Sequence, residues 1–419
     1  MKINLYFENN GITNLADNRT PFLNAIPSEH VSKSVLNNKT DISIIEMPES
    51  YFAMSSKTFY SNFNSNYKIS KEEKFYYPII FNTTNLINYV DTLAVPKIII
   101  RLTLKGFCKI LIVCPSEGWP WETYNILIDS LITRYKLKYT DFVILTAKLN
   151  DHPKCKVVYY NFWEMRSTIR NYEKDLELGK KSVFNHMCRP YKFICLNRRA
   201  NWHRFSVISK LWEIREQGLL SFWKEGVFQD DFNYAIEQKK QFILNTPNLA
   251  KIWELNKIDD YMPLYLPEHY DLFKSNNIEK SSCPLWLNKY VTHDPYTKKF
   301  FDSYLHIVTE TLINDEGFFS EKIFKPIIYC QPFILIGQYK GLEYFKKIGY
   351  KTFSNVIDES YDLEKDNEKR IIMATDSAIE FVKKIDNNLM IELWPIFEHN
   401  LKVFFNRSIN IIDNLKKEL

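Results

Sequence analysis

Glycine is scarce in this sequence: the 419 residues include 10 glycines but 30 phenylalanines and 26 tyrosines. Collagenous and low-complexity chains need far more glycine and far fewer aromatic residues, so both classes are excluded. With 45% hydrophobic residues, a chain of 419 residues can bury two ordinary cores. We therefore expect two globular domains of roughly 150–200 residues each.

Cysteine is also sparse and follows no pattern. The seven cysteines are scattered and form no C-x-x-C pair, which argues against both a disulfide framework and a zinc site. The opening residues MKINLYFENN lack the apolar core of a secretory signal. No run approaches the roughly 18 apolar residues of a membrane span. We expect a cytoplasmic protein, in the host cytoplasm if the chain is viral, with no integral membrane segment.

Neither sign of charge dominates, and the familiar nucleotide-loop motifs are missing. The 55 basic and 50 acidic residues give a net charge of +5, which favours an anionic ligand only weakly. The sequence contains no D-x-D triplet, no G-x-G-x-x-G loop and no Walker loop. We therefore predict no metal site and no bound cofactor. A nucleotide diphosphate would have to be neutralised by basic side chains and by helix ends.

What the sequence does show is a regular alternation of short β-type runs with longer helical patterns. This alternation predicts βαβ units and mainly parallel sheets, that is, an α/β fold. The first half reads as a Rossmann-like domain with strands at 109–115, 141–147 and 156–163 and a helix at 121–137.

The second half has the layout of a nucleotide-binding βαβαβ unit. It opens with a strand at 192–197 and a helix that Gly218 is expected to end in the left-handed conformation. The pattern then predicts these elements: a strand at 304–311, a helix at 320–330, a strand at 332–337, a helix ending at Gly349 and a strand at 350–353.

The most distinctive motif is FFSEKIFKP, at Phe318–Pro326. Ser320 is a good N-cap, and the N-terminus of the helix that follows presents free N–H groups and a positive dipole end, which suits an anion. Lys322 adds a full positive charge where a cation is unfavourable unless an anion is bound. Glu321 can accept two hydroxyl hydrogen bonds, as a ribose or sugar diol would offer. The alternative is that Glu321 and Lys325 form an ordinary surface pair on the helix.

A second basic motif, LNRRANWHR at Leu196–Arg204, follows a buried-type strand. Open α/β sheets bind ligands at the carboxyl ends of their strands, and arginine supplies bidentate donors to a diphosphate. We favour Arg198 or Arg199 as a diphosphate ligand over His203 or Arg204. The alternative is that the Arg198–Arg199 pair is a solvated pair of loop cations.

Two carboxylates are further candidates. Glu310 ends the strand pattern YLHIVTET, at the same sheet edge as Ser320, and a buried carboxylate there should bind a cation or hydroxyls; the alternative is a rim carboxylate paired with a lysine. Glu117 follows an apolar strand in CPSEGWPWE, beside two tryptophans, and is the candidate base for an acceptor hydroxyl. It ranks ahead of Glu122, Asp151 and Glu8, and the alternative is a turn glutamate beside core tryptophans.

Taken together, these motifs resemble the donor domain of fucosyltransferase-like GT-B enzymes. They resemble still more the uncharacterised glycosyltransferase-like proteins of phages, large viruses and bacteria that carry an FxSEKxFKP motif. The shared segments lie within about residues 190–370 and are Phe318–Pro326, Pro332–Leu335, Gly349–Phe353 and Asp358–Asp362. No fucosyltransferase-like acceptor domain is recognisable, so fucose itself is not implied.

The resemblance implies a GT-B fold, in which two Rossmann-like domains face each other across a cleft. It implies that Arg198 or Arg199 and Lys322 bind the donor diphosphate, that Glu321 binds the ribose, and that Glu310 binds the transferred sugar. The full set of expected donor-binding residues is Arg198, Arg199, Glu310, Ser320, Glu321, Lys322 and Lys325.

We accordingly expect an acceptor-side domain over residues 1–180, a donor domain over 181–385 and a C-terminal helix over 386–419 that packs back on the first domain. The expected activity is metal-independent transfer of a sugar from a nucleotide sugar to an acceptor hydroxyl of a glycan. One rival is transfer to a modified nucleobase of viral DNA. Another is a non-catalytic nucleotide- or sugar-binding protein of the same fold.

Overall fold

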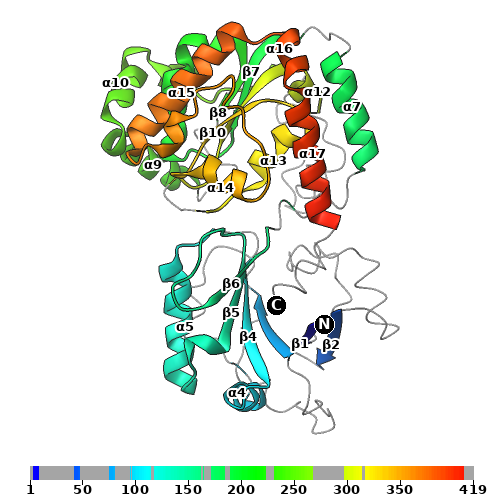
Figure 1. Cartoon of the computed structure of the whole chain (residues 1–419). Coiled ribbons are helices and arrows are strands. Elements are labelled where there is room, and N and C mark those ends of the chain that lie inside the picture. The colour runs from blue at the N-terminus through cyan, green and yellow to red at the C-terminus, as the bar shows by residue number, and fades with distance from the viewer. Residues whose placement is uncertain are drawn as a thin grey trace, which may run out of the picture. The chain divides into compact units, whose positions relative to one another are not determined.

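The computed structural model describes most of the chain. The chain divides into two compact units. The described residues are 3–8, 42–47, 75–80, 95, 97–114, 118–161, 164, 171–184, 189–222, 231–267, 297–313 and 317–409. One unit comprises Met1–Thr168 together with Arg407–Leu419, and the other comprises Ile169–Asn406. Each unit contains a parallel β-sheet flanked by helices, so the predicted α/β class is confirmed (Figure 1).

The first unit is built on a six-stranded parallel sheet with the strand order β2-β1-β3-β4-β5-β6. The strands are β1 (Ile3–Glu8), β2 (Ile42–Met47), β3 (Phe75–Ile80), β4 (Cys108–Cys114), β5 (Phe142–Thr146) and β6 (Lys156–Tyr159). The sequence CKILIVC of β4 is apolar at nearly every position because both faces of a parallel sheet are covered.

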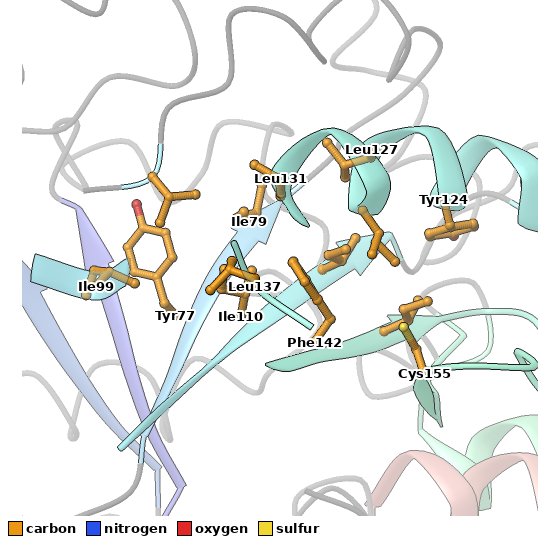
Figure 2. Close-up of a cluster of buried hydrophobic side chains, with 14 of the residues drawn as sticks. Tyr77, Ile79, Ile99, Ile110, Tyr124, Leu127, Leu131, Leu137, Phe142 and Cys155 are labelled. Atoms are coloured by element: carbon orange, nitrogen blue, oxygen red, sulfur yellow. The ribbon is translucent and has the colours of Figure 1, made fainter. Parts of the chain in front are cut away.

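Two helices of this unit, α4 (Lys97–Leu104) and α5 (Trp121–Tyr135), contribute to a core formed with the sheet. Figure 2 shows Tyr124, Leu127 and Leu131 of α5 directed toward strand residues that include Ile110. The spacing of these α5 residues places one apolar stripe on the sheet, as expected for an amphipathic helix. A short 3₁₀ turn, η2 (Tyr139–Asp141), precedes β5.

The second unit has a four-stranded parallel sheet with the order β10-β9-β7-β8. Its strands are β7 (Tyr191–Asn197), β8 (Gly218–Phe222), β9 (Ser303–Thr309) and β10 (Phe333–Ile336). The chain runs outward from β7 to β8, then returns to the other side of β7 and runs outward from β9 to β10. The strand order therefore reverses between β7 and β9, and this reversal is the topological switch point where open α/β sheets bind ligands.

The helices of the second unit form two groups, which Figure 1 shows on opposite sides of the sheet. Helix α8 packs with α9, α10 and α15, whereas α12 and α13 contact β9. The α-helices are α7 (Tyr172–Phe184), α8 (Trp202–Leu211), α9 (Asp231–Asn245), α10 (Pro247–Leu255), α12 (Thr297–Phe301), α13 (Glu321–Ile328), α14 (Gly341–Lys347), α15 (Asn367–Lys384), α16 (Asn387–Glu392) and α17 (Trp394–Ile409). The 3₁₀ turns are η4 (Trp212–Gln217), η5 (Ile258–Tyr261) and η6 (Ser360–Leu363).

Two local predictions are wrong. Gly218 does not end a helix in the left-handed region: its φ is −142°, and it opens β8. An added Cβ at Gly218 would lie 2.4 Å from the Phe193 ring, so the glycine is required by packing against β7. Residues 350–353 form no strand, because the main-chain N–H and C=O of Lys351 are bonded to the side chain of Asn400 from α17.

No helix within the described part of the chain is both long enough and apolar enough to span a membrane.

Candidate functional site

The candidate site lies at the carboxyl ends of β7 and β9, the switch point of the second unit. The loop after β7 leads into α8, and the loop after β9 leads into α13. Both basic motifs found in the sequence therefore reach the same sheet edge. Hydrogen bonds from side chains at the start of α8 to main-chain carbonyls of the loop after β9 hold these two segments together.

Asn201 and His203 hold the loop after β9 through its main chain. The Asn201 Nδ2 donates to the Thr311 carbonyl at 2.9 Å, and its Oδ1 accepts from the Tyr234 hydroxyl at 3.0 Å. The side chain therefore does not cap α8, although Asn201 occupies the N-cap position. The His203 Nε2 lies 2.9 Å from the Glu310 carbonyl and must donate to it. Burial, reinforced by the Arg204 charge, lowers the pKa of His203 to about 3. His203 is therefore a neutral structural donor at physiological pH.

Arg204 is a buried cation between the two loops, with only 3% of its surface exposed. Its Nη1 donates to the Arg199 carbonyl at 3.0 Å and its Nη2 to the Glu310 carbonyl at 3.4 Å, while its Nε has no partner. Within the described residues the guanidinium forms no ion pair with a carboxylate. Burial lowers its pKa, although Glu321 and Glu310 oppose this effect from a distance. These two carboxylates offset only part of the cost of burial, since the pKa of Arg204 stays lowered, so this position favours a bound anion.

Glu310 ties the loop after β9 to the start of α13. Its carboxylate accepts from the Ser320 N–H at 3.3 Å, from the Ser320 hydroxyl and from the Thr311 N–H at 3.2 Å. Burial raises the pKa of Glu310, against the opposing effects of Lys322 and of the Ser320 hydroxyl. Both carboxylate oxygens are already engaged by the protein, so the geometry supports a positioning role for Glu310, and its contact with a sugar stays a prediction.

Glu310 is also packed tightly against β10. An added Cβ at Gly337 would lie 3.3 Å from the Glu310 Cβ. Any larger residue at position 337 would therefore require Glu310 to shift by a few tenths of an ångström. Arg370 joins the end of β10 to the loop after β9, because it donates to the Gly337 and Ile313 carbonyls at 3.1 Å each. The positions of these main-chain segments are thus set by side chains distant in the sequence.

The N-terminus of α13 carries the predicted cap. The Ser320 hydroxyl accepts from the Lys322 N–H at 3.4 Å, and Ser320 has the extended backbone typical of an N-cap. The Lys322 ammonium donates to Thr311 Oγ1 at 2.9 Å, to Ser320 Oγ at 3.1 Å and to Glu321 Oε1 at 3.0 Å. Lys322 therefore joins the helix start to the loop after β9.

Glu321 is the most exposed acid of the site, with 40% of its side chain accessible. Partial burial by itself would raise its pKa, but the positive charges of Lys322 and Lys325 outweigh burial and lower the pKa to about 2. Glu321 is ionised at neutral pH and presents carboxylate oxygens near the switch point.

The remaining predicted donor residues lie on the loop after β7 and further along α13. Arg199 is exposed and Arg198 half-buried in the loop after β7. Lys325 lies one turn further along α13, with its Nζ 5.8 Å from the centre of the Phe300 ring. The structure thus brings together Ser320, Glu321, Lys322 and Glu310, with Arg198 and Arg199 on the adjacent loop and Lys325 beyond the first turn.

In the first unit, Glu117 lies outside the described residues. The neighbouring Trp121 packs against the core of this unit. Its ring is 5.3 Å from Tyr124, 5.1 Å from His152 and 5.1 Å from the Lys148 ammonium. These neighbours favour packing over sugar stacking for Trp121.

His152 is likewise committed to the fold of the first unit. Its Nδ1 accepts from the N–H groups of Lys154 and Cys155, at 3.1 and 3.0 Å, and its Nε2 lies 3.0 Å from Asn125 Oδ1. Burial, aided by the Lys154 charge, lowers its pKa. Both ring nitrogens are occupied, so His152 is not arranged as a general base.

Sequence reasoning ranked Arg204 below Arg198 and Arg199, yet Arg204 is the buried cation of the site. A usable signal was present. Arg204, Ile208 and Leu211 are spaced as i, i+4 and i+7, and the last two are apolar, which indicates a buried position for the arginine; in the structure α8 is buried on nearly all sides. Thr311 was also overlooked, although its N–H, carbonyl and hydroxyl are all bonded within the site.

Among the described residues, no group of three or more His, Cys, Asp or Glu side chains is arranged to hold a metal ion. Comparison of the chain with protein-family models, with curated proteins and with solved structures finds no match in any of the three.

Proposed function

We propose that this chain is a glycosyltransferase that holds the diphosphate of a nucleotide sugar at the carboxyl ends of β7 and β9. The observation that carries the proposal is the buried guanidinium of Arg204, which forms no salt bridge among the described residues and lies at the switch point. The N-terminus of α13 and the Lys322 ammonium add positive potential at the same edge. A diphosphate supplies the counter-charge that this arrangement favours.

Each side chain of the cluster has a distinct role in the proposal. Lys322, Arg204 and the loop arginines Arg198 and Arg199 neutralise the diphosphate, whose negative charge grows as the sugar leaves. The ionised Glu321 accepts the ribose hydroxyls. Glu310 keeps the start of α13 in place and, in the proposal, also contacts the transferred sugar.

The chemistry is a substitution at the anomeric carbon of the donor. The bond from that carbon to the diphosphate oxygen breaks, and the nucleoside diphosphate leaves with the bonding electrons. The acceptor hydroxyl oxygen forms the new bond, and its proton passes to a base. In this proposal the two α/β units form a GT-B enzyme, the first unit binds the acceptor, a glycan or a nucleobase hydroxyl, and Glu117 is the base.

A panel of nucleotide sugars and nucleoside diphosphates, screened by thermal unfolding, tests the donor site, because a ligand that binds only the folded state raises the unfolding temperature. We expect at least one nucleotide class to stabilise the protein, and Lys322→Ala to abolish that stabilisation. Lys383→Ala is the matched control, since Lys383 forms an exposed helix pair with Glu380 away from the site. Equal loss in both variants, or no stabilisation by any nucleotide, would contradict the proposal.

Turnover separates an enzyme from a binding protein of the same fold. The stabilising nucleotide sugar is incubated with the protein, and release of nucleoside diphosphate is followed with water or an added acceptor. Release that depends on Lys322 supports a transferase. Tight binding with no release under any acceptor condition would show instead a non-catalytic nucleotide-binding protein.

A further inference from the structure

All three N–H donors of the Lys322 ammonium are used within the protein itself. They go to Thr311 Oγ1, Ser320 Oγ and Glu321 Oε1, at 2.9, 3.1 and 3.0 Å. An ammonium group has three donors and no acceptor. Lys322 therefore cannot donate to a phosphate until it releases one of these partners.

Glu321 is the partner that can leave. Ser320 and Thr311 belong to the bonded framework around Glu310, whereas Glu321 has 40% of its side chain exposed. A partly exposed ion pair between neighbouring residues is worth little. Releasing Glu321 leaves both hydroxyl contacts of the ammonium in place, and these contacts join Lys322 to the N-cap residue Ser320 and to the loop after β9.

A negative ligand cannot simply take the place of Glu321. Once Lys322 turns to a phosphate, the Glu321 carboxylate is left ionised beside a second anion, and like charges repel. The repulsion is relieved if the same ligand brings hydroxyl groups that donate to Glu321. A ribose supplies two neighbouring hydroxyls at a short distance from a 5′-diphosphate.

We propose that Glu321 and Lys322 exchange partners when the donor binds, and that this exchange makes the site select a ribonucleoside diphosphate over inorganic pyrophosphate. The inference rests on the proposed function and adds a specificity device to it. Glu321 thus acts in two opposite ways, as an attractive partner for the ribose and as a repulsive gate against a bare anion. Specific sites commonly combine attraction of the correct ligand with repulsion of the wrong one.

Glu321→Gln separates these two actions because it keeps the shape of the side chain and removes its charge. With no ion pair to break and no repelling carboxylate, inorganic pyrophosphate should bind roughly threefold or more tightly. The nucleoside diphosphate should bind about tenfold more weakly, since charge-assisted bonds from the ribose hydroxyls are lost. An ordinary binding residue would change both affinities in the same direction.

The experiment is isothermal titration of the whole protein with inorganic pyrophosphate, with whichever of UDP, GDP, ADP or CDP stabilises it most, and with the 2′-deoxy form of that nucleotide. Wild type, Glu321→Gln and Glu343→Gln are compared; Glu343 forms an exposed helix pair with Lys340 and serves as the control. We expect opposite changes for the two main ligands in Glu321→Gln only. The preference of the wild type for ribose over deoxyribose should also shrink in that variant.

The outcomes distinguish this inference from the proposed function. If no nucleotide binds the wild type, the donor site itself is refuted. If the nucleotide binds but Glu321→Gln weakens pyrophosphate as well, or leaves it unchanged, the partner exchange is refuted and the donor site stands. Thermal unfolding of each unliganded variant verifies that it is folded. Glu321→Ala must also bind pyrophosphate more tightly and the nucleoside diphosphate more weakly than wild type.

Discussion

Ser320 donates both its amide N–H and its hydroxyl to the carboxylate of Glu310. The first residue before α13 is thus fixed to the residue that follows β9. Because Lys322 also reaches Thr311 on the same loop, the helix start and the strand end form one bonded unit. The positive end of α13 is therefore held at the switch point before any ligand binds, which is what a preorganised anion site requires.

This contact gives a pH dependence that can be measured. The pKa of Glu310 is raised, mainly by burial, so over a range above the unfolded value of about 4.3 the folded protein keeps a proton that the unfolded chain has lost. Stability from this group is present in acid and declines as the pH rises through the folded pKa. Glu310→Gln does not titrate, so the stability advantage of wild type over this variant should narrow from pH 4 toward neutral pH.

Denaturant unfolding at a series of pH values tests this, and Glu321→Gln is the control of opposite sign. The pKa of Glu321 is lowered to about 2, although burial alone would raise it, because Lys322 and Lys325 outweigh burial. Stability from Glu321 is therefore present above the unfolded pKa and lost as the pH falls toward 2. A wild-type advantage over Glu310→Gln that widens with rising pH would show that the Glu310 pKa is not raised.

Arg204→Met tests whether the buried guanidinium serves ligand binding more than folding. The variant removes two hydrogen bonds to main-chain carbonyls but also removes a buried charge whose burial is only partly offset by Glu321 and Glu310. These effects oppose each other, so the free energy of unfolding should change by less than about 1 kcal/mol. Nucleotide affinity should fall at least about tenfold in a titration. Unchanged affinity would remove Arg204 from the site.

Glu164 and Arg407 form a buried ion pair in the first unit, where the Glu164 side chain is 0% exposed. The arginine bonds both carboxylate oxygens, with Nη2 3.3 Å from Oε2. Arg407→Met leaves an uncompensated buried carboxylate and should cost about 3–5 kcal/mol of stability. Adding Glu164→Leu should restore most of this loss. Denaturant unfolding of the single and double variants checks both, and a double variant no better than Arg407→Met would refute the explanation.

Asn400 carries the main-chain bonds of the segment in which a strand was expected. Its Oδ1 accepts from the Lys351 N–H at 2.7 Å, and its Nδ2 donates to the Lys351 carbonyl at 2.9 Å. Asn400→Ala should cost about 1–3 kcal/mol because two partly buried main-chain groups of Lys351 lose their partner. Asn400→Asp should cost at least as much near neutral pH, since it places a carboxylate oxygen against a carbonyl. If thermal unfolding showed the Asn400→Asp variant to be more stable than the Asn400→Ala variant, this geometry would be contradicted.

Much of the parallel framework could be predicted from the sequence because its signals are local. The apolar runs that became β4, β5, β7, β9 and β10 are short and bounded by turn residues, and such runs read as buried strands. Ser320 was recognisable as an N-cap for the same reason. Local patterns thus give the elements and the sheet edge at which the motifs meet.

What local patterns could not give are the contacts between distant segments. Residues 350–353 look like a strand, but a side chain 49 positions away takes their main-chain bonds. Gly218 looks like a helix cap, but the Phe193 ring sets its conformation. The burial of Arg204 and the hydrogen bonds between Glu310 and Ser320 depend on contacts between segments that are far apart in the sequence. A short stretch of sequence does not contain that information. The role of Glu117 stays a prediction.

A crystal structure of the protein soaked with the nucleoside diphosphate that stabilises it most tests the central claim most directly. The account predicts density for the diphosphate at the carboxyl ends of β7 and β9, with a phosphate oxygen within hydrogen-bonding distance of the Lys322 ammonium and the ribose hydroxyls at Glu321. Density elsewhere on the molecule, with Lys322 still bonded to Glu321, would contradict it.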